Sequence, residues 1–476
     1  MTAATETAPH AGAAPSEFPA GFRWGAATAA FQVEGALDAD GRTPSTWDTF
    51  TAVPGRVHGE HRADVAVDHY HRYREDVALM AELGLNTYRF SVSWPRVQPD
   101  GRGPANPKGL DFYSRLVDEL LANGIDPMLT LYHWDHPQVL QDAGGWADRD
   151  MAQRFADYAG LVAARLGDRV PLWVTLNEPW CTAFLGHASG IHAPGVADDA
   201  TTLAVAHHLN LAHGLGVQAL RAALPASAQV SIALNPAPVR TRGTSPADLD
   251  AVRRADALRN RIFFDPLLRG AYPADLIADT AHVSDWSFVR DGDLATAAVP
   301  IDVLGVNYYT PLYVAGGEGP ADPYNRWVGS EGLVHVAPAE GPATIHGQVD
   351  AGGLRELLNR IRHDYGPVPI MIAENGVSYP DQLGPDGRVD DVGRVDYLHA
   401  HLAALHDAIT DGVDVRGYVM WSLIDNFEWV YGYSQTFGLI HVDRATQRRT
   451  IKNSGHWYRG VIAANAIPPL NTPAAG

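Results

Sequence analysis

The amino-acid sequence predicts an α/β protein folded as a single (β/α)8 barrel. Eight short runs rich in β-branched and aromatic residues are spread along the chain, and stretches with helical periodicity lie between them. The runs lack strict alternation of polar and apolar residues, which predicts strands covered on both faces. Eight such strands alternating with helices close most economically as a barrel. The expected strands are residues 22–28, 86–91, 126–133, 170–178, 229–235, 301–309, 369–375 and 416–422.

The helical stretches end at glycines, where a helix C-cap is expected. Apolar residues including Val77 and Met80 recur at helical spacing before Gly84, and residues 116–121 carry a second apolar stripe before Gly124. An open doubly wound sheet is the alternative architecture. No strand is followed by a glycine-rich nucleotide-binding turn, however, so the sequence favours the closed TIM-barrel arrangement.

The chain is expected to contain one folded domain, residues 18–465, and two tails. Residues 1–17 are rich in Ala, Thr and Pro and are expected to be disordered, whereas residues 466–476 resemble a frayed, flexible end. A barrel of this kind routinely exceeds the length of an average domain, so 476 residues do not require a second one.

Composition and charge argue against several classes of protein. The net charge is −19 and no run of Lys or Arg occurs, so a nucleic-acid partner is not expected. Neither a signal-peptide pattern nor a run of about twenty apolar residues is found, which predicts no membrane partner and a cytoplasmic protein. With one cysteine, Cys181, no intrachain disulfide is expected, and no motif indicates a cofactor. The sequence does not indicate an oligomeric state.

Polar and aromatic residues follow the predicted strands, at the end of the barrel where active sites lie. Because these ends and their loops form one face, we expect the side chains to meet. Two acids, several amides and several indoles are typical of a carbohydrate pocket, in which rings stack on sugar C–H surfaces and polar groups address hydroxyls. The residues are Arg89, His133, Trp134, Asn177, Glu178, Asn307, Tyr309, Glu374, Asn375 and Trp421.

Each of the two acids is followed by residues that shape the backbone. Glu178 precedes Pro179, whose ring disfavours the α region for the preceding residue and so predicts an extended glutamate. Glu374 precedes Asn375 and Gly376, a pair typical of sharp turns. A lone glutamate before proline is more often an exposed loop residue. The surrounding indoles and amides favour catalysis here.

The remaining histidines and the cysteine do not indicate a metal or a nucleophile. Adjacent His207 and His208, and the i,i+2 pair His69 and His71, do not face one site on a helix, and no HExxH motif accompanies them. No metal is therefore expected. Cys181 follows Glu178 closely, but no base pairs with it by sequence, which favours a structural thiol.

The motifs together resemble glycoside hydrolase family 1, the β-glucosidase family, and its bacterial members in particular. The resemblance extends from Phe18 to about Ala464. It is specific because all the motifs occur in the expected order. They are FRWGAATAAFQVEGA, YRFSVSWPRV, LYHWDHPQ, TLNEPW, GVNYYTP, IAENG and MWSLIDNFEW.

The resemblance implies a retaining β-glycosidase that acts on β-D-glucosides by double displacement, with Glu178 as acid/base and Glu374 as nucleophile. Glu178 should then carry a raised pKa while Glu374 stays ionised, with Arg89 and Tyr309 as supporting groups. The carboxyl groups should lie about 5–5.5 Å apart. A cis peptide after Trp421 is also implied. The glycone is expected to contact Gln32, His133, Trp134, Asn177, Asn307, Tyr309, Trp421, Glu428, Trp429 and Phe437.

Four positions depart from the family pattern. His346-Gly347-Gln348-Val349 stands where Gly-Trp-x-Val is usual, so an indole that commonly lines the aglycone site is missing. His136, Ala373 and Thr436 replace the usual Leu, Thr and Arg. Because Gly347 and His136 are expected near the pocket mouth, they predict an altered aglycone preference. Glu428 stands where phospho-sugar members carry Ser, which favours an unphosphorylated sugar because a carboxylate repels phosphate.

Other functions remain open at the level of sequence. A transglycosylase keeps the same two glutamates, and a β-glycosidase could act on a specialised glycosylated metabolite. A non-catalytic sugar-binding barrel is a further alternative, because fold does not guarantee activity. Epimer preference, including side activity on β-galactosides or β-fucosides, is also undetermined.

Overall fold

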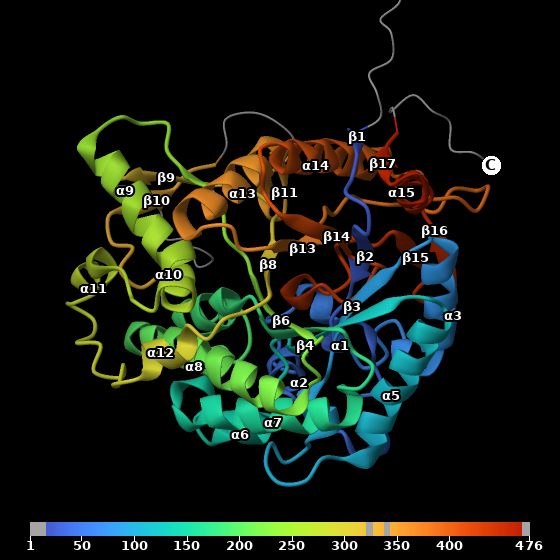
Figure 1. Cartoon of the computed structure of the whole chain (residues 1–476), viewed down its shortest axis with the longest axis horizontal. Helices are drawn as coiled ribbons and strands as arrows, with labels where there is room; N and C mark the ends of the chain where they lie inside the picture. Colours follow the sequence, from blue (N-terminus) through green and yellow to red (C-terminus); the bar gives the residue numbers. More distant parts are fainter. Residues whose placement is uncertain (1–15, 320–326, 338–342, 469–476) are drawn as a thin grey trace, which may run out of the picture.

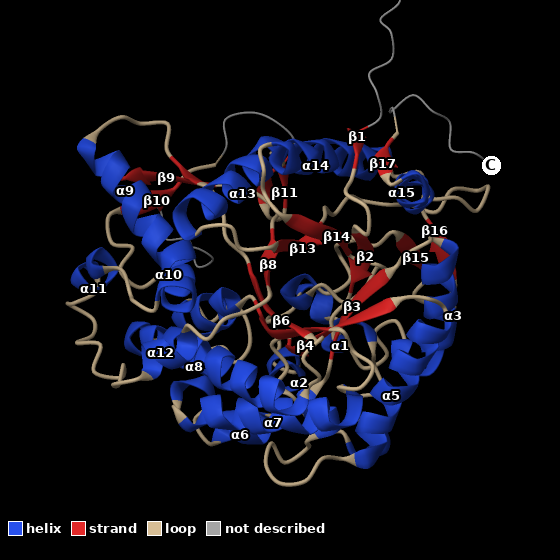
Figure 2. Ribbon diagram, viewed as in Figure 1, coloured by secondary structure: helices blue, strands red, loops and turns tan. Residues whose placement is uncertain are grey.

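Eight parallel strands close into a barrel. The computed structural model describes residues 16–319, 327–337 and 343–468, and its barrel strands pair in the order β13-β14-β2-β3-β4-β5-β6-β8 (Figures 1 and 2). Each strand coincides with a predicted run to within two residues at either end, so the predicted fold class is confirmed. The strands are β2 (Arg23–Ala27), β3 (Thr87–Ser91), β4 (Asp126–Tyr132), β5 (Leu172–Asn177), β6 (Gln229–Leu234), β8 (Val303–Asn307), β13 (Ile370–Asn375) and β14 (Val415–Trp421).

Helices connect successive strands and cover the outside of the barrel (Figure 2). Gly84 and Gly124 follow two of them with φ of +74° and +70°, the left-handed conformation expected after a helix C-cap. The principal helices are α3 (His69–Glu82), α5 (Pro107–Ala122), α7 (Asp150–Leu166), α8 (Asp199–Ala223), α9 (Pro246–Asp256), α10 (Ile262–Arg269), α13 (Ala351–Tyr365), α14 (Val392–Thr410) and α15 (Asn453–Ala464).

Short helical turns and minor strands lie in the loops between the barrel strands and the principal helices. The helical turns are α1 (Ala30–Val33), η1 (Ala39–Gly41), α2 (Thr46–Thr51), η2 (His58–Glu60), α4 (Trp94–Val97), α6 (Gln138–Asp142), η3 (Gly145–Ala147), η4 (Cys181–Ala188), η5 (Ala257–Arg261), α11 (Ala274–Asp279), α12 (Asp293–Ala297) and η7 (Trp429–Tyr431). The minor strands are β7 (Val239–Arg240), β9 (Leu312–Gly316), β10 (Leu333–His335), β11 (Ala343–Thr344), β12 (Gly347–Gln348), β15 (Ile440–Val442) and β16 (Arg449–Ile451).

The two ends of the folded domain pair with each other. β1 (Ser16–Glu17) lies antiparallel to β17 (Ala466–Ile467), next to α14 and α15 (Figure 1). The predicted tail boundaries therefore need correction by two residues at each end, because backbone hydrogen bonding between the ends orders residues that composition alone assigns to tails. The rest of the predicted tails, residues 1–15 and 469–476, lies outside the described residues.

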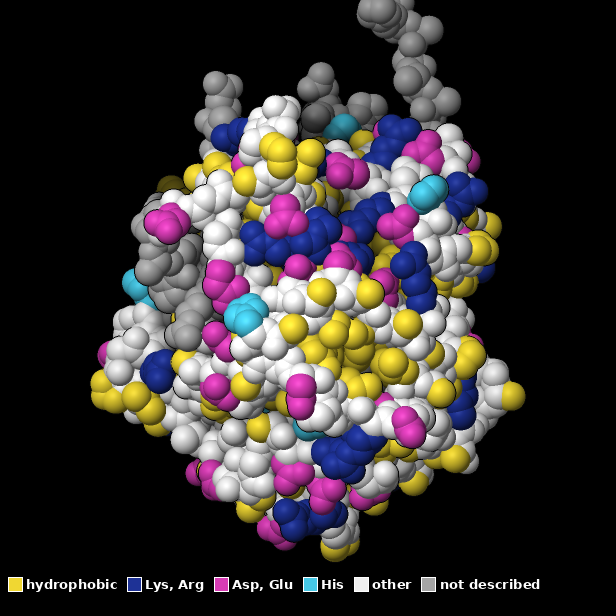
Figure 3. Space-filling view, turned by 90° about the vertical axis from the view of Figure 1, so that its left-hand side faces the viewer, with side chains coloured by type: hydrophobic (Ala, Val, Ile, Leu, Met, Phe, Trp, Pro, Cys, Tyr) yellow, Lys and Arg dark blue, Asp and Glu magenta, His cyan; other side chains and the backbone are white. Residues whose placement is uncertain are grey.

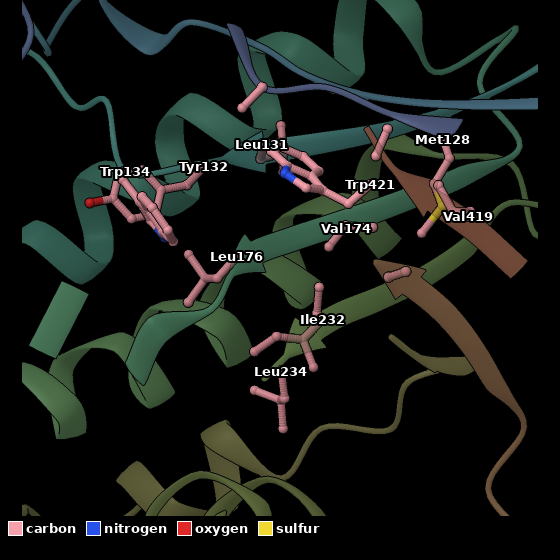
Figure 4. Packing of buried hydrophobic residues seen from close by; sticks show 14 of the residues in the cluster. Met128, Leu131, Tyr132, Trp134, Val174, Leu176, Ile232, Leu234, Val419 and Trp421 are labelled. Atoms are coloured by element: carbon pink, nitrogen blue, oxygen red, sulfur yellow. The ribbon is translucent and has the colours of Figure 1, made fainter. Parts of the chain in front are cut away.

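The side chains inside the barrel change from apolar to polar along the strands. Buried apolar side chains such as Val174, Ile232 and Val419 pack between neighbouring strands (Figure 4). Toward the C-terminal ends of the strands, buried polar side chains replace them, among them Arg89 and Asn177. Burying so many polar groups is stable only when they bond to one another, so this end of the barrel contains a hydrogen-bonded network.

The face that carries α9 to α12 shows basic and acidic side chains side by side (Figure 3). Arg253 lies 2.7 Å from Asp279, and Arg261 lies 2.6 Å from Asp275. Cations and anions on this face are thus paired locally. In the described part of the chain, no helix combines the length and hydrophobicity needed to cross a membrane.

Candidate active site

A cavity of about 470 Å³ opens at the C-terminal end of the barrel strands. This volume falls within the range of small-molecule sites. Polar and aromatic side chains from many loops form its wall. The predicted residues on that wall are His133, Trp134, Glu178, Asn307, Tyr309, Glu374, Trp421, Glu428 and Trp429.

Glu374 ends β13 and receives two strong hydrogen bonds. Arg89 Nη1 donates to Oε1 at 2.5 Å, and the Tyr309 hydroxyl donates to Oε2 at 2.7 Å. Both donors stabilise a negative charge on this carboxyl. Gly376 does not have a positive φ, so it is not required for a left-handed conformation. A Cβ at Gly376 would lie 1.7 Å from the carbonyl oxygen of Trp421, so glycine is required for the close approach of β13 and β14.

Glu178 follows β5 with φ of +45°, so the predicted extended conformation is wrong. Proline disfavours the right-handed α region of the preceding residue, but the surrounding contacts here select the left-handed region instead. Asn307 Nδ2 donates to Oε1 at 2.7 Å, and the Cys181 thiol donates to Oε2 at 3.0 Å. Burial raises the pKa of the Cys181 thiol well above its usual value, which keeps it protonated as a donor.

Asn177 connects the two acids through a shared network. Its Oδ1 accepts from Arg89 Nη2 at 2.6 Å and from Asn307 Nδ2 at 3.0 Å. Its Nδ2 donates to His133 Nε2 at 2.9 Å, which leaves the proton of the neutral imidazole on Nδ1. One amide therefore fixes the side chains that hold Glu374, Glu178 and the pocket histidine.

The carboxyl groups of the pocket are desolvated together. Burial and the nearby Glu178 raise the pKa of Glu374 to about 7, although Arg89 and Tyr309 oppose this effect. That Glu374 stays ionised in the free enzyme remains a prediction, which the Arg89 and Tyr309 donors favour and burial opposes. Burial, reinforced by Glu374, also raises the pKa of Glu428 to about 8. Glu428 is thus mainly neutral at pH 7, so the proposed repulsion of phosphate by this residue needs correction.

Aromatic rings form one wall of the cavity. The ring of His133 stacks at 5.8 Å on both Trp421 and Trp429, and Trp134 lies 4.5 Å from Trp429. Figure 4 shows Trp421 at the end of β14 and Trp134 after β4. The peptide bond after Trp421 is cis, as the family resemblance implies. These rings offer a face suited to the C–H surface of a sugar.

Among the residues of the predicted site, three buried polar atoms have no partner within the described part of the chain. They are Gln32 Oε1, His133 Nδ1 and Asn307 Oδ1. Buried polar atoms are nearly always hydrogen-bonded in stable proteins. Such atoms beside a cavity therefore favour a ligand rich in hydroxyl groups.

Five of the residues expected at the site do not line the cavity. One is Asn375, whose Nδ2 donates to the carbonyl oxygen of Tyr308 and to the Tyr397 hydroxyl. Arg89 and Asn177 lie behind Glu374 in the network, and Gln32 Nε2 donates to Glu428 Oε2 at 3.3 Å. Phe437 packs edge-on against Tyr309 at 6.5 Å. The other four hold wall residues in place, and direct contact of any of the five with a ligand stays a prediction.

The expected placement of His136 at the pocket mouth is wrong, whereas Gly347 lies beside two residues of the cavity wall, His346 and Thr310. His136 is 1% exposed and contacts Tyr132 and Gln141, because the short loop after β4 turns it into the core. Gly347 lies in the β11–β12 hairpin with φ of +120°, a conformation that resists any side chain. Its neighbour His346 lines the cavity instead and stacks on Tyr309 at 4.4 Å.

The other two departures from the family pattern also lie off the cavity wall. The carbonyl oxygen of Ala373 accepts from Arg89 Nη1 at 3.1 Å. The Thr436 hydroxyl donates to the carbonyl oxygen of Tyr379. The Ala373 contact helps to position Arg89, whereas the Thr436 contact joins two loops outside the cavity wall.

The histidine pairs noted in the sequence have separate structural partners. His207 Nε2 lies 2.9 Å from Asp293, whereas His208 Nδ1 bonds the carbonyl oxygen of Trp146. His69 bonds Asp76 within α3. Among the described residues, no group of three or more His, Cys, Asp or Glu side chains is arranged to hold a metal ion.

Sequence reasoning missed part of the wall. Trp180, Arg259 and Trp327 line the cavity, and Cys181 contacts Glu178 directly. The position of Cys181 three residues after Glu178 could have indicated this contact. Arg259 lies in a crossover segment whose approach to the cavity depends on the tertiary fold.

Comparison with known proteins places this chain among well-described relatives. Residues 14–467 match the model of glycosyl hydrolase family 1. The chain is 47% identical to a bifunctional β-D-glucosidase/β-D-fucosidase from Bifidobacterium breve, over 94% of this chain and 98% of that protein. It is 50% identical to thermostable β-glucosidase B from Thermobispora bispora, over 94% and 91%.

Solved structures agree with these matches. The crystal structure of a psychrophilic β-glucosidase from Micrococcus antarcticus superposes with a TM-score of 0.91 at 49% identity, covering 94% of this chain and 98% of that one. A β-glucosidase from Thermotoga maritima in complex with glucoimidazole superposes with a TM-score of 0.89 at 39% identity, covering 95% and 100%.

Proposed function

The chain belongs to glycosyl hydrolase family 1, and on that premise we propose that it is a retaining β-glucosidase in which Glu374 is the nucleophile and Glu178 the acid/base. The observation that carries this assignment is the difference between the donors on the two acids. Glu374 receives a guanidinium and a phenol hydroxyl, whereas Glu178 receives an amide and a thiol.

The different donors assign different roles to Glu374 and Glu178. Both carboxyls line one buried cavity, where the donors that each receives decide how well a negative charge is stabilised. The Arg89 cation stabilises the charge on Glu374 more strongly than neutral donors stabilise a charge on Glu178. We therefore assign the attack on the sugar to Glu374 and proton transfer to the leaving oxygen to Glu178, whose donors are neutral.

The reaction then proceeds in two displacements. Glu374 attacks the anomeric carbon and forms a glycosyl ester, while Glu178 protonates the departing glycosidic oxygen. In the second step Glu178 removes a proton from water, which attacks the same carbon and releases Glu374. Two inversions give net retention. The mechanism predicts a separation of about 5–5.5 Å between the carboxyl groups.

The glycone is proposed to occupy the end of the cavity formed by Trp421, Trp429 and Glu428. A mainly neutral Glu428 can donate one hydrogen bond and accept others, which suits neighbouring sugar hydroxyls. His133 Nδ1 and Asn307 Oδ1 supply further partners. Gln32, Trp134, Asn177 and Phe437 complete the predicted set.

The preferred sugar epimer and the location of the protein in the cell are also proposals. The Bifidobacterium breve relative is named for both glucosidase and fucosidase activity, which favours side activity on β-fucosides here. No observation favours the transglycosylase, the specialised-metabolite enzyme or the non-catalytic barrel over hydrolysis. A cytoplasmic location and the lack of a nucleic-acid partner stay predictions from composition.

The proposed function is tested with nitrophenyl glycosides. We expect turnover of the β-D-glucoside, slower turnover of the β-D-galactoside and β-D-fucoside, and none of the α-D-glucoside. Proton NMR of the first sugar released should show the β anomer, because two displacements retain configuration. Initial release of α-glucose would overturn the mechanism, and failure to cleave any β-glycoside would revive the binding-protein alternative.

The hydroxyl of Tyr309 is expected to set the acid limb of the pH profile. Glu374 must be ionised to attack, so activity is present above its pKa and is lost as pH falls through it. The Tyr309 hydrogen bond lowers this pKa, so Tyr309→Phe should raise it and move the acid limb of kcat/KM to higher pH. We also expect kcat to fall by roughly tenfold to a hundredfold.

A matched control is the neighbouring buried Tyr308, whose hydroxyl donates to the carbonyl oxygen of Asp350, away from Glu374. Tyr308→Phe removes an equivalent hydroxyl and should leave the acid limb in place. An unmoved acid limb in Tyr309→Phe, or an equal shift in both variants, would contradict this role.

A further inference from the structure

One cation on the cavity wall is not used by the proposed mechanism. Arg259, in the helical turn η5, lines the cavity and places its guanidinium carbon 4.0 Å from the centre of the Trp180 ring. Stacking on an indole fixes the plane of a guanidinium while leaving its N–H edges free to bind an acceptor.

Arg259 differs from the other arginines of its segment. Each of the others forms an ion pair with an aspartate. Arg253 pairs with an aspartate of α11, and Arg254 and Arg261 pair with aspartates of α9. Among residues 16–319, 327–337 and 343–468, no carboxylate pairs with Arg259 and no acceptor receives a hydrogen bond from it. Two aspartates of the same segment, Asp250 and Asp256, are directed to Arg254 and Arg261 instead.

Leaving this cation unpaired in the cavity carries an energetic cost. Arg259 is only partly exposed, and burial lowers the pKa of its guanidinium. A desolvated charge is normally compensated by an ion partner. The adjacent His346 does not supply a competing positive charge, because burial lowers the pKa of its imidazole to about 4.

Arg259 lies on the side of the cavity where the leaving group, and not the glycone, is expected to bind. Its guanidinium interacts electrostatically with Glu178 and Cys181. In the proposed mechanism Glu178 adjoins the glycosidic oxygen, so groups beyond Glu178 contact the aglycone. Trp327, which lies 5.2 Å from Trp180 in an edge-on arrangement, adds a second indole to this part of the wall.

We propose that Arg259 is the binding residue for an anionic substituent on the aglycone, and that the enzyme favours β-glucosides of aromatic carboxylic acids. The two indoles suit an aromatic ring, and the guanidinium suits a carboxylate that it can bind through two parallel hydrogen bonds. This inference rests on the proposed β-glucosidase activity and adds the chemical class of the group that leaves.

The test compares substrates that differ in one charge. The 3- and 4-carboxyphenyl β-D-glucosides are measured against the corresponding carbamoylphenyl β-D-glucosides, which have the same shape but no charge. For at least one regioisomer, wild type should prefer the carboxylate by about tenfold to a hundredfold in kcat/KM. Arg259→Met should abolish this preference, because kcat/KM should fall by a larger factor on the carboxylate than on the carboxamide, and Arg259→Lys should retain part of it.

Arg242 provides the matched control. It stacks on Tyr313 at 5.4 Å in the same manner but does not line the cavity, so Arg242→Met should leave the preference intact. Equal losses on charged and neutral substrates in Arg259→Met would mean that the guanidinium acts only through Glu178, and would overturn the anion site. No charge preference in wild type would also overturn it, although the glucosidase assignment would stand. Failure to cleave either substrate would instead refute the proposed function.

Discussion

Glu374→Ala is expected to lower kcat on β-glucosides by about 10⁴-fold or more. The loss follows because no other described carboxylate receives the paired donation of Arg89 and Tyr309, so the covalent intermediate cannot form. Removing the carboxylate also leaves the Arg89 cation buried without its ion partner, a change that typically costs about 3–5 kcal/mol of stability.

A small anion should restore part of this activity. Azide can enter the space that Glu374→Ala vacates beside Arg89, which lies on the face of the sugar opposite the leaving group. From there it can attack the anomeric carbon once. With an activated substrate such as 2,4-dinitrophenyl β-D-glucoside, we expect α-glucosyl azide, identified by NMR. Glu374→Gln, which preserves shape, controls for loss of folding. Near-normal turnover in either variant, or formation of β-glucosyl azide by Glu374→Ala, would remove Glu374 from the role of nucleophile.

Glu178→Ala is expected to show a loss that depends on the leaving group. Cellobiose has a poor leaving group and needs the proton, so kcat/KM should fall by about 10²- to 10⁴-fold. A dinitrophenolate departs without protonation, so kcat/KM on that substrate should change little. Breakdown of the glycosyl ester still needs a base, so kcat on the activated substrate should fall and azide should raise it, giving β-glucosyl azide.

Cys181 offers a matched control for this variant. Cys181→Ala removes a neutral donor to the same carboxyl but leaves the carboxyl itself. It should therefore reproduce little of the dependence on leaving group. If Glu178→Ala lost the same factor on cellobiose and on the dinitrophenyl substrate, proton donation by Glu178 would be disproved.

The barrel and its functional end could be predicted from local patterns. Each strand run is short, apolar on both sides and followed by a helical stretch, and the residues after it face one end of the closed sheet. Glu178 and Glu374 were therefore placed at the cavity from chain position alone. The boundaries at residues 17 and 466 were misplaced, because the pairing of β1 with β17 joins segments from opposite ends of the chain.

Other features of the site depend on contacts between distant segments. Pro179 alone predicts an extended Glu178. In the structure Glu178 has a positive φ, and its carboxyl accepts hydrogen bonds from Asn307 on β8 and Cys181 on η4. The raised pKa of Glu374 could not be predicted from its strand, because desolvation is a property of the whole cavity. Gly347 was expected at the mouth, but the hairpin turns His346 into the cavity instead.

The sequence by itself determined the (β/α)8 barrel, the two glutamates and their amide and indole neighbours, because these depend on periodicity and on the position of a residue within its own strand. Only the tertiary structure decided which donors reach each glutamate, how far burial shifts the ionisation of Glu374, and that Arg259 lies on the cavity wall without an ion partner among the described residues. The reason is physical: propensity and pattern act over a few residues, whereas burial, charge pairing and cavity shape arise only when segments far apart in the chain are packed together.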